Sequence, residues 1–199
     1  MTASVTLREL TGLGHTPTTV GKSALILIDC QNTYREGVMQ LEGVEPALVE
    51  CQKLLQRFRD AGRPVIHIQH DAGPGTPYDV KARIGAIADV VKPLDHEAVV
   101  VKNYPRSFEK TNLDEILKNY KVEELTIAGF MTHVCVNSTA RAAFNHGYRA
   151  TVVANATATR SLPNPTGGVV EASALQDASL TALHDMFAVV VPRSENVER

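Results

Sequence analysis

The chain has 199 residues, of which 44% are hydrophobic and 21% are charged, and its formal net charge is −2. This length and composition fit one ordinary globular domain with a single buried core. The lysine and arginine residues are scattered and not massed in one segment, which argues against a nucleic-acid-binding protein and against binding to an anionic membrane. A small neutral substrate is compatible with this charge.

The three cysteines are Cys30, Cys51 and Cys135, an odd number without a CxxC pair. This usage argues against a disulfide framework and a structural zinc site, and it favours the cytoplasm. The N-terminal segment 1–20 lacks the apolar core of a signal peptide, and no apolar run approaches the roughly 20 residues that span a bilayer. We therefore expect neither export nor membrane insertion.

Short apolar runs rich in valine and isoleucine recur along the chain. They occupy residues 24–29, 64–70, 98–102, 125–130, 150–155 and 187–192. Near-continuous apolar runs of this length are typical of strands that are buried on both faces of a sheet.

The first helix is expected over residues 46–62, with Pro46 near its start and Gly62 as its stop. Its apolar positions are spaced three and four residues apart, at Leu48, Cys51, Leu55 and Phe58. Cys51 is therefore assigned to the core stripe of this helix.

Three further helices are expected later in the chain. Residues 111–120 open with a candidate capping box, Thr111 and Asp114, and residues 133–147 end on Gly147 as a candidate C-cap. The third helix lies within 169–186, and its expected core stripe is Leu175, Ala178, Ala182 and Met186.

Strands and helices thus alternate, which predicts a mainly parallel sheet with helices on both faces, a three-layer α/β/α fold. Ligands bind such folds beyond the carboxyl ends of the strands. The irregular segment 70–97 is predicted to be a loop with one short helix and to form part of the rim of a pocket.

Polar groups stand at four strand ends, namely Asp29, His70, Lys102 and the turn before Cys135. Alone, Asp29 could be a turn residue or helix cap, and Lys102 an edge charge that reaches water. Together at one sheet edge they would form an ion pair with shifted pKa values.

Cys135 could fill the core, bind a metal or act as a nucleophile. At the first turn of a helix its thiol would lie near backbone N–H groups, and a neighbouring lysine would favour the thiolate. The same N–H groups could stabilise an oxyanion, while an aspartate accepts the thiol proton and later delivers it to a leaving amine. This chemistry requires all three groups to converge.

These residues resemble a known family. The stretches LILIDCQNTY, VVVKNYPRSFEKTNL and IAGFMTHVCVNSTARAA look like the three signature blocks of the isochorismatase-like cysteine hydrolases, a superfamily that also holds nicotinamidases, N-carbamoylsarcosine amidases and streptothricin hydrolases. The resemblance extends from about residue 23 to about residue 191. It implies a Rossmann-like fold with a six-stranded parallel sheet, as a single hydrolase domain over 21–199 after an N-terminal extension over 1–20.

The resemblance also implies a catalytic triad. Asp29 would be the general base, Lys102 its charge partner and Cys135 the nucleophile. A cis peptide bond between Phe130 and Met131 would precede the nucleophile, and the backbone N–H groups of Met131 and Cys135 would form the oxyanion hole.

Two departures from subfamilies refine the expected activity. Nicotinamidases carry an Asp-x-His element that binds a metal, but no histidine follows Asp29 in CQNTYREGVMQLEGVEP, and His67 and His70 would face opposite sides of a strand. We therefore expect no metal and no other cofactor. Family members that hydrolyse the vinyl ether of isochorismate typically lack the nucleophilic cysteine, so Cys135 favours attack on a C–N carbonyl.

The leading hypothesis is a metal-independent cysteine hydrolase that cleaves a small amide or related C–N bond through a thioester on Cys135. The alternatives are an isochorismatase-type ether hydrolase and a non-catalytic binding or redox-sensing protein. Family resemblance and the frequency of symmetric dimers predict a homodimer or a higher homo-oligomer.

Several other residues are candidates for binding the substrate, although each of the aromatic ones could instead pack in the core or at a subunit contact. The candidates are Tyr34, His70, Tyr104, Phe108 and His133. Cys30 should point away from Asp29 and is assigned a structural role.

Overall fold

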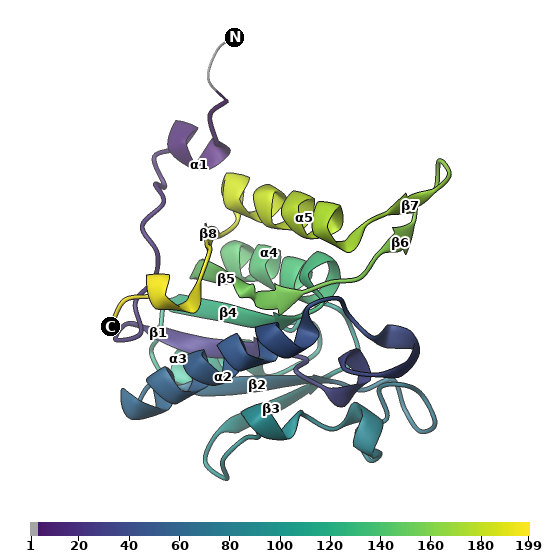
Figure 1. Ribbon diagram of the computed structural model, residues 1–199. Helices are drawn as coiled ribbons and strands as arrows, with labels where there is room; N and C mark the ends of the chain where they lie inside the picture. Colours follow the sequence, from purple (N-terminus) through teal and green to yellow (C-terminus); the bar gives the residue numbers. More distant parts are fainter. Residues whose placement is uncertain (1–3) are drawn as a thin grey trace.

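Six parallel strands form the central sheet of the protein, whose computed structural model describes residues 4–199 (Figure 1). The strands lie in the order β3-β2-β1-β4-β5-β8, and every neighbouring pair is parallel. Their bounds are Ser23–Ile28 (β1), Val65–His70 (β2), Ala98–Lys102 (β3), Glu124–Phe130 (β4), Arg149–Ala158 (β5) and Val189–Val191 (β8). The predicted α/β fold is confirmed, and the strand order reverses between β1 and β4, which is where ligands bind in such sheets.

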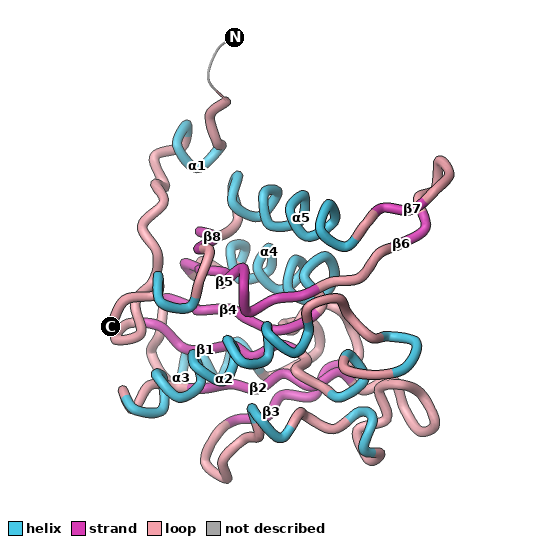
Figure 2. Tube along the Cα trace, in the orientation of Figure 1, coloured by secondary structure: helices cyan, strands magenta, loops and turns pink. Residues whose placement is uncertain are grey.

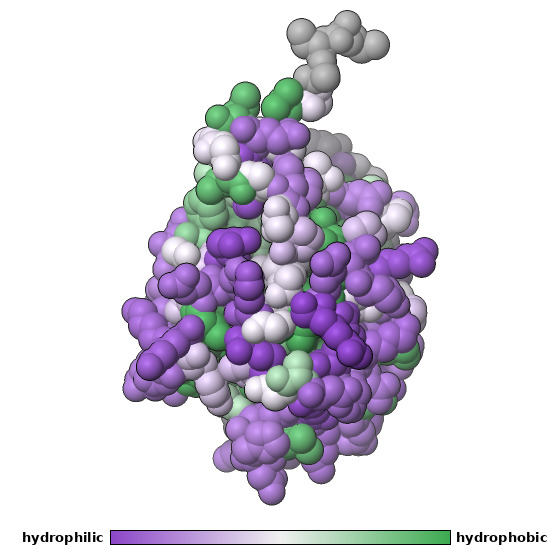
Figure 3. Space-filling view, turned by 90° about the vertical axis from the view of Figure 1, so that its left-hand side faces the viewer, coloured by the Kyte–Doolittle hydropathy of each residue, from purple (hydrophilic) through white to green (hydrophobic). Residues whose placement is uncertain are grey.

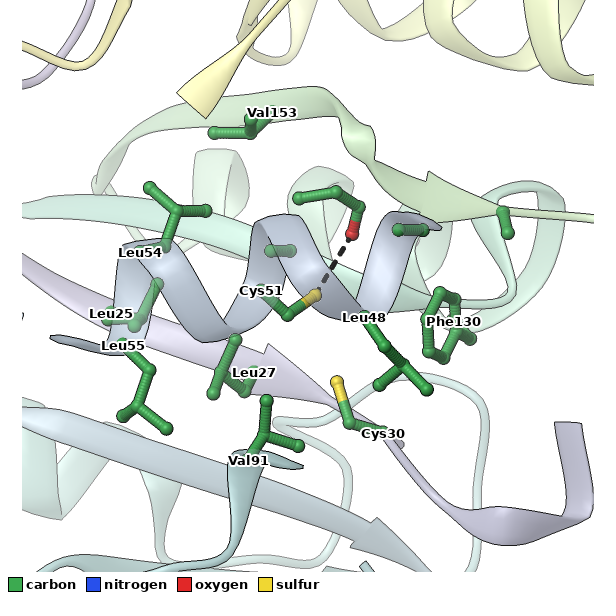
Figure 4. Packing of buried hydrophobic residues seen from close by; sticks show 14 of the residues in the cluster. Leu25, Leu27, Cys30, Leu48, Cys51, Leu54, Leu55, Val91, Phe130 and Val153 are labelled. Atoms are coloured by element: carbon green, nitrogen blue, oxygen red, sulfur yellow. Dashed lines mark hydrogen bonds between the residues drawn. The ribbon is translucent and has the colours of Figure 1, made fainter. Parts of the chain in front are cut away.

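Helices cover both faces of this sheet (Figure 2). Helix α2 (Val44–Asp60) packs on one face, and α3 (Leu113–Asn119), α4 (Asn137–Asn145) and α5 (Ala172–Met186) lie on the other. The predicted core stripe of α2 is buried, and Figure 4 shows Cys51 in this layer with its thiol 3.3 Å from the Ala156 carbonyl oxygen. Cys30 lies in the same apolar layer.

The core stripe predicted for α5 was wrong. Ala178 and Ala182 are exposed, and Leu175 and Met186 are only partly buried. The residues that α5 buries are instead Ala172, Ser179 and Leu183. Alanine is compatible with either face of a helix, so an alanine-rich pattern does not define the buried side.

The ends of two other helices also differ from expectation. The capping box of Thr111 and Asp114 does not form, because Asn112 is the N-cap of α3 and Asp114 pairs with Lys118. Residues 133–147 are not one α-helix: a π-helical turn, Thr132–Val136, precedes α4. Gly147 does follow the end of α4, with a φ of +87°.

The irregular segment 70–97 contains two short 3-10 helices in place of the single expected one. They are Arg83–Gly85 and Asp89–Val91. A small two-stranded sheet, β6 (Leu162–Pro163) and β7 (Val169–Val170), projects between β5 and α5.

The N-terminal part of the described chain reaches along the molecule before it enters β1. A short helix, α1 (Leu7–Leu10), contacts α5, and the Val20 N–H group donates to the Glu198 carbonyl oxygen at 2.7 Å. Apolar side chains of this segment are exposed, including Leu10 and Leu13, and green atoms gather just below the grey tail in Figure 3. Among the helices of residues 4–199, none is both long enough and apolar enough to cross a membrane.

Candidate active site

The ends of three strands bring Asp29, Lys102 and Cys135 together. Lys102 Nζ lies 2.7 Å from Asp29 Oδ2 and 3.4 Å from Cys135 Sγ. The side chains of Asp29 and Lys102 have no solvent exposure. Lys102 belongs to β3, which is separated from β1 by β2, so its long side chain crosses the end of β2 to reach Asp29. The structure therefore joins the three groups that the sequence placed at strand ends.

Asp29 sits where β1 stops and the chain turns. Its φ is +49°, a left-handed conformation that is uncommon for a residue other than glycine. The Gln31 N–H group donates to the Asp29 carbonyl oxygen at 2.7 Å and closes this tight turn. A local backbone strain of this kind is characteristic of residues whose side chain must point in a fixed direction.

Lys102 has a third close contact, with His70 at the end of β2. Lys102 Nζ lies 3.1 Å from His70 Nδ1, so the three N–H groups of the ammonium face an oxygen, a sulfur and a nitrogen acceptor. Burial and then the charge of Lys102 lower the pKa of His70 to about 4. His70 is therefore neutral near pH 7, and it carries its proton on Nε2 because Nδ1 accepts from Lys102.

Gln31 fixes the backbone of His70. Its side-chain amide donates to the His70 carbonyl oxygen at 3.0 Å, and its Oε1 accepts from the His70 N–H group at 2.8 Å. The same amide nitrogen also donates to the Gly85 carbonyl oxygen at 2.7 Å. Gln31 is fully buried, so it ties the end of β2 and the segment around Gly85 to the turn after Asp29.

The thiol of Cys135 lies in the π-helical turn that leads into α4. Burial and then the negative charge of Asp29 raise its pKa to about 12, and the opposing effect of Lys102 does not cancel them. As expected, Lys102 acts in favour of the thiolate and lowers the pKa of Cys135, but burial and the negative charge of Asp29 outweigh it. Cys135 therefore rests as a thiol beside a carboxylate.

The backbone before Cys135 is unusual. The peptide bond between Phe130 and Met131 is cis. Gly129, one residue earlier, has a φ of +114°, and a Cβ at this position would lie 2.0 Å from the Ile28 carbonyl oxygen. Only glycine permits this close approach of β4 to β1. Across the part of the chain that the structure describes, the Met131 N–H group donates to no protein acceptor.

The predicted substrate-binding residues lie in different places. Tyr34 is only 1% exposed and packs edge-on against Phe130, with ring centroids 5.9 Å apart, so it lies in the core beneath the site. His133 is partly buried, and its Nδ1 lies 2.5 Å from Thr159 Oγ1. Burial and then the charge of Arg160 lower the pKa of His133.

The structure does not bring Tyr104 or Phe108 to the triad. Tyr104 is 42% exposed, and the Lys110 ammonium lies over the face of its ring at the surface. Phe108 stacks on His146 and Tyr148, which follow α4 at its end away from Cys135. Both residues follow Lys102 closely in sequence. The backbone between them stays beside α4, where Ser107 bonds to Thr139, but the two rings pack against these other partners.

Two residues at the site were missed in the sequence. Tyr78 packs edge-on against His70 and Tyr34, at centroid distances of 5.0 and 5.9 Å. Arg160 follows the end of β5 and carries its charge close to both His133 and Tyr78. Tyr78 lies in an irregular loop without any periodic signal, whereas Arg160 could have been found as a charged residue just beyond a strand end.

Nothing in the described residues groups three or more His, Cys, Asp or Glu side chains as ligands for a metal ion. His67 faces away from His70 and lies 3.0 Å from Glu97 Oε2, deep in a separate network. The site as described therefore consists of an ion pair, a thiol and a neutral imidazole.

Comparison with known proteins assigns this chain and its fold to a family. The Isochorismatase domain family matches residues 23–195, and the chain belongs to the isochorismatase family. A crystal structure of an isochorismatase from Pseudomonas putida KT2440 superposes with a TM-score of 0.92 at 34% identity, over 96% of this chain and 97% of that one.

Two curated relatives illustrate the range of the family. The secreted isochorismatase effector Isc1 of Verticillium dahliae is 31% identical over 92% of this chain and 95% of its own length. The ureidoacrylate amidohydrolase RutB of Pseudomonas savastanoi is 28% identical over 69% of this chain and 71% of its own. The prediction of a hydrolase of the isochorismatase family is confirmed.

Proposed function

We propose that this protein is a metal-independent cysteine hydrolase that cleaves a small amide or related C–N bond. The observation that carries the proposal is the buried contact of Lys102 with both Asp29 and Cys135. A thiol next to a carboxylate is equipped for proton transfer and nucleophilic attack. The amidohydrolase named among the relatives supports the choice of bond.

In the first half of the reaction, Asp29 takes the proton of the Cys135 thiol as the sulfur attacks the substrate carbonyl carbon. The carbonyl electrons move to oxygen, and the N–H groups of Met131 and Cys135 stabilise the resulting oxyanion. The intermediate collapses, the C–N bond breaks, and Asp29 returns the proton to the leaving amine. The product is a thioester on Cys135.

In the second half, Asp29 accepts a proton from water as the water oxygen attacks the thioester. The C–S bond breaks, the carboxylic acid product leaves, and the proton returns to the Cys135 sulfur. Lys102 remains charged throughout. It holds Asp29 and the sulfur in contact and limits the cost of burying the carboxylate.

The test is a panel of small amides, nicotinamide and isochorismate, assayed with and without a chelator. We expect turnover of an amide that survives chelation, is abolished in Cys135→Ala, and leaves an acyl adduct on Cys135 detectable by mass spectrometry of a quenched reaction. Cys51→Ala, which removes a buried thiol in the apolar layer under α2, is the matched control and should keep activity.

Three results would count against the proposal. Full turnover by Cys135→Ala would show that Cys135 is not the nucleophile. Loss of activity on chelation would show that the enzyme requires a metal. Hydrolysis of isochorismate alone, unaffected by Cys135→Ala, would favour the ether hydrolase.

We also propose that the protein is a homo-oligomer, and the exposed apolar side chains of the N-terminal segment support this. Analytical ultracentrifugation tests it, since a monomer at micromolar concentration would contradict it. The cytoplasm remains our proposed location, although one relative is named a secreted effector. Cell fractionation would decide between the two.

A further inference from the structure

Two histidines from opposite ends of the chain stack on each other outside the active site. His15 lies in the N-terminal segment and His184 in the last turn of α5, and their ring centroids are 4.4 Å apart, with an angle of 21° between the ring planes. Both residues are partly buried. Neutral rings can stack at this distance, but two positive charges held this close would repel each other. The protonation of the two rings therefore decides whether they can stay in contact.

The hydrogen bonds of both rings fit their neutral forms. The Val190 N–H group donates to His184 Nδ1 at 3.0 Å, so this nitrogen carries no proton. His15 Nε2 lies 3.0 Å from Thr6 Oγ1, and this hydroxyl gives its own proton to Glu9 Oε2, so it accepts from His15. His15 Nδ1 is then without a proton, and it is buried without a partner in the described residues 4–199. A second proton on either ring would be a buried donor that lacks an acceptor, and on His184 it would face the Val190 N–H group.

The charged groups near the pair come from the N-terminal segment, from α5 and from the start of β5. They are Arg8, Glu9, Asp185 and, through its effect on Arg8, Arg149. Burial, and then His15 and Arg8, lower the pKa of His184 below its ordinary value of 6.5, and Glu9 opposes them. The surroundings therefore favour the neutral ring that the hydrogen bond from Val190 requires.

Few other contacts hold residues 4–15 to the domain. The Leu7 N–H group donates to Asp185 Oδ1 at 2.9 Å, and Arg8 Nη1 donates to the Met186 carbonyl oxygen at 3.0 Å. A cavity of about 170 Å³ separates part of the segment from the domain, and its lining includes Leu13, Phe144 and Phe187. The large apolar side chains of the segment are exposed to solvent, as Figure 3 shows, and they are Val5, Leu7, Leu10 and Leu13. Apolar burial therefore contributes little to holding the segment in place.

The chain is anchored again three residues after His15. Thr18 is buried, its N–H group donates to Thr151 Oγ1 at 2.8 Å, and its Oγ1 lies 3.1 Å from Thr126 Oγ1. Threonine hydroxyls do not titrate in the range in which histidine does. Gly14 has a φ of +64°, so the backbone just before His15 already uses the freedom of glycine. Residues 14–18 can therefore act as a hinge between a releasable segment and a fixed one.

We propose that His15 and His184 form a pH-sensitive clasp. With both rings neutral, the clasp holds residues 4–15 on α5, and protonation of either ring releases them. An exposed histidine has an ordinary pKa of about 6.5, whereas the pKa of His184 is lowered while the segment is docked. The released form therefore binds more protons than the docked form, and it gains population as the pH falls below about 6.5.

Hydrogen–deuterium exchange of the full-length protein between pH 5 and pH 8 tests this proposal. The rates are corrected for the intrinsic effect of pH on exchange and are read in peptides that cover residues 4–17. At pH 8 the bonded N–H groups of Leu7 and Leu13 should be protected, and at pH 5 they should exchange at least about tenfold faster. Peptides from β1 and β4 should keep their protection, which shows that the domain stays folded.

Two variants remove one titrating ring each. His184→Asn keeps a side-chain acceptor for the Val190 N–H group, and His15→Phe keeps a ring for the stack. In both variants the corrected exchange of residues 4–17 should change by less than about threefold between pH 8 and pH 5, whatever its level at pH 8. His96→Asn, which alters an exposed histidine elsewhere, is the control and should keep the wild-type transition.

Three results would overturn the clasp. The first is wild-type exchange of residues 4–17 that stays constant from pH 8 to pH 5. The second is a transition that persists in both His184→Asn and His15→Phe, because the carboxylates of Glu9 and Asp185 would then be responsible. The third is a transition that His96→Asn also removes.

Discussion

Lys102 Nζ and His70 Nδ1 lie 3.1 Å apart, and this contact completes the acceptors around the buried ammonium. His70 contributes to the site through Lys102 and need not touch the substrate. Such a residue would position the proposed catalytic groups, and its loss should affect the rate without changing the chemistry.

Replacing His70 by leucine removes the third acceptor of Lys102 and leaves one N–H group of the ammonium unpaired. We expect kcat/KM to fall about tenfold, and His70→Asn, which keeps an acceptor, to recover part of the loss. Because the pKa of His70 is lowered to about 4, the wild-type pH profile should show no His70 titration near 6.5. If the wild-type profile of kcat/KM shows an inflection near pH 6.5 that both variants lack, His70 titrates there and is not neutral as described above.

The raised pKa of Cys135 predicts slow alkylation of the protein without substrate. With a pKa of about 12, little thiolate is present between pH 7 and 9, so iodoacetamide should react far more slowly than with a free cysteine of pKa about 8.5. Asp29→Asn removes a negative charge that raises the pKa, and it should accelerate alkylation at a given pH. Peptide mapping must place the label on Cys135, since Cys30 and Cys51 are also free thiols. Rapid wild-type labelling at pH 7 would disprove the resting thiol.

Alanine substitutions at Gly129 and Gly167 form a matched pair that tests why β4 requires glycine where it approaches β1. Both have a positive φ, of +114° and +106°, but a Cβ at Gly129 would meet Ile28 whereas a Cβ at Gly167 would meet nothing within 4 Å. Gly129→Ala should therefore lower the free energy of unfolding by about 3 kcal/mol or more beyond the effect of Gly167→Ala. Urea unfolding of the two variants measures this difference, and equal losses would show that steric contact is not the reason for glycine.

The lowered pKa of Glu97 predicts that the stability of the fold depends on pH, through a group outside the active site. Although burial raises its pKa, hydrogen bonds from Arg59, the Leu94 N–H group and His67 lower it to about 2. The folded state therefore binds fewer protons than the unfolded state, so this stabilisation is present above the ordinary pKa of 4.5 and is lost as the pH falls through about 2.

Glu97→Gln should consequently lower the free energy of unfolding at pH 6, and its difference from wild type should shrink as the pH falls toward 2. Chemical unfolding at a series of pH values measures this. Glu36→Gln alters an exposed ion pair with Arg83, so it should change stability by at most about 1 kcal/mol. A wild-type advantage over Glu97→Gln that stays constant from pH 6 to pH 2 would contradict the lowered pKa.

The sequence was sufficient to predict features that depend on chain order and periodicity. Strands end in Asp29 and Lys102, parallel strands present their carboxyl ends at one edge, and the convergence of these residues with Cys135 follows. It was not sufficient where the direction of a side chain decides the result. Phe108 follows Lys102 by six positions yet packs beside Tyr148, and no spacing rule indicates this.

Two further differences between the sequence-based expectations and the structure have an energetic origin. The thiol state of Cys135 depends on the balance of burial, Asp29 and Lys102, which residue types alone do not define. Arg160 could have been found in the sequence as a charged residue just beyond a strand end, but its buried Nε without an acceptor is a property of the folded surroundings. Both concern the interaction of residues that are distant in sequence.

The contact between Val20 and Glu198 places the C-terminal segment beside the start of β1, and Figure 1 shows the C-terminus there, away from the loops that follow the carboxyl ends of the strands. The proposed catalytic residues, Asp29, Lys102 and Cys135, lie at the opposite edge. An affinity tag or a linker to a solid support at the C-terminus therefore leaves the substrate entrance clear, so the protein can be immobilised through that end for the assays described above.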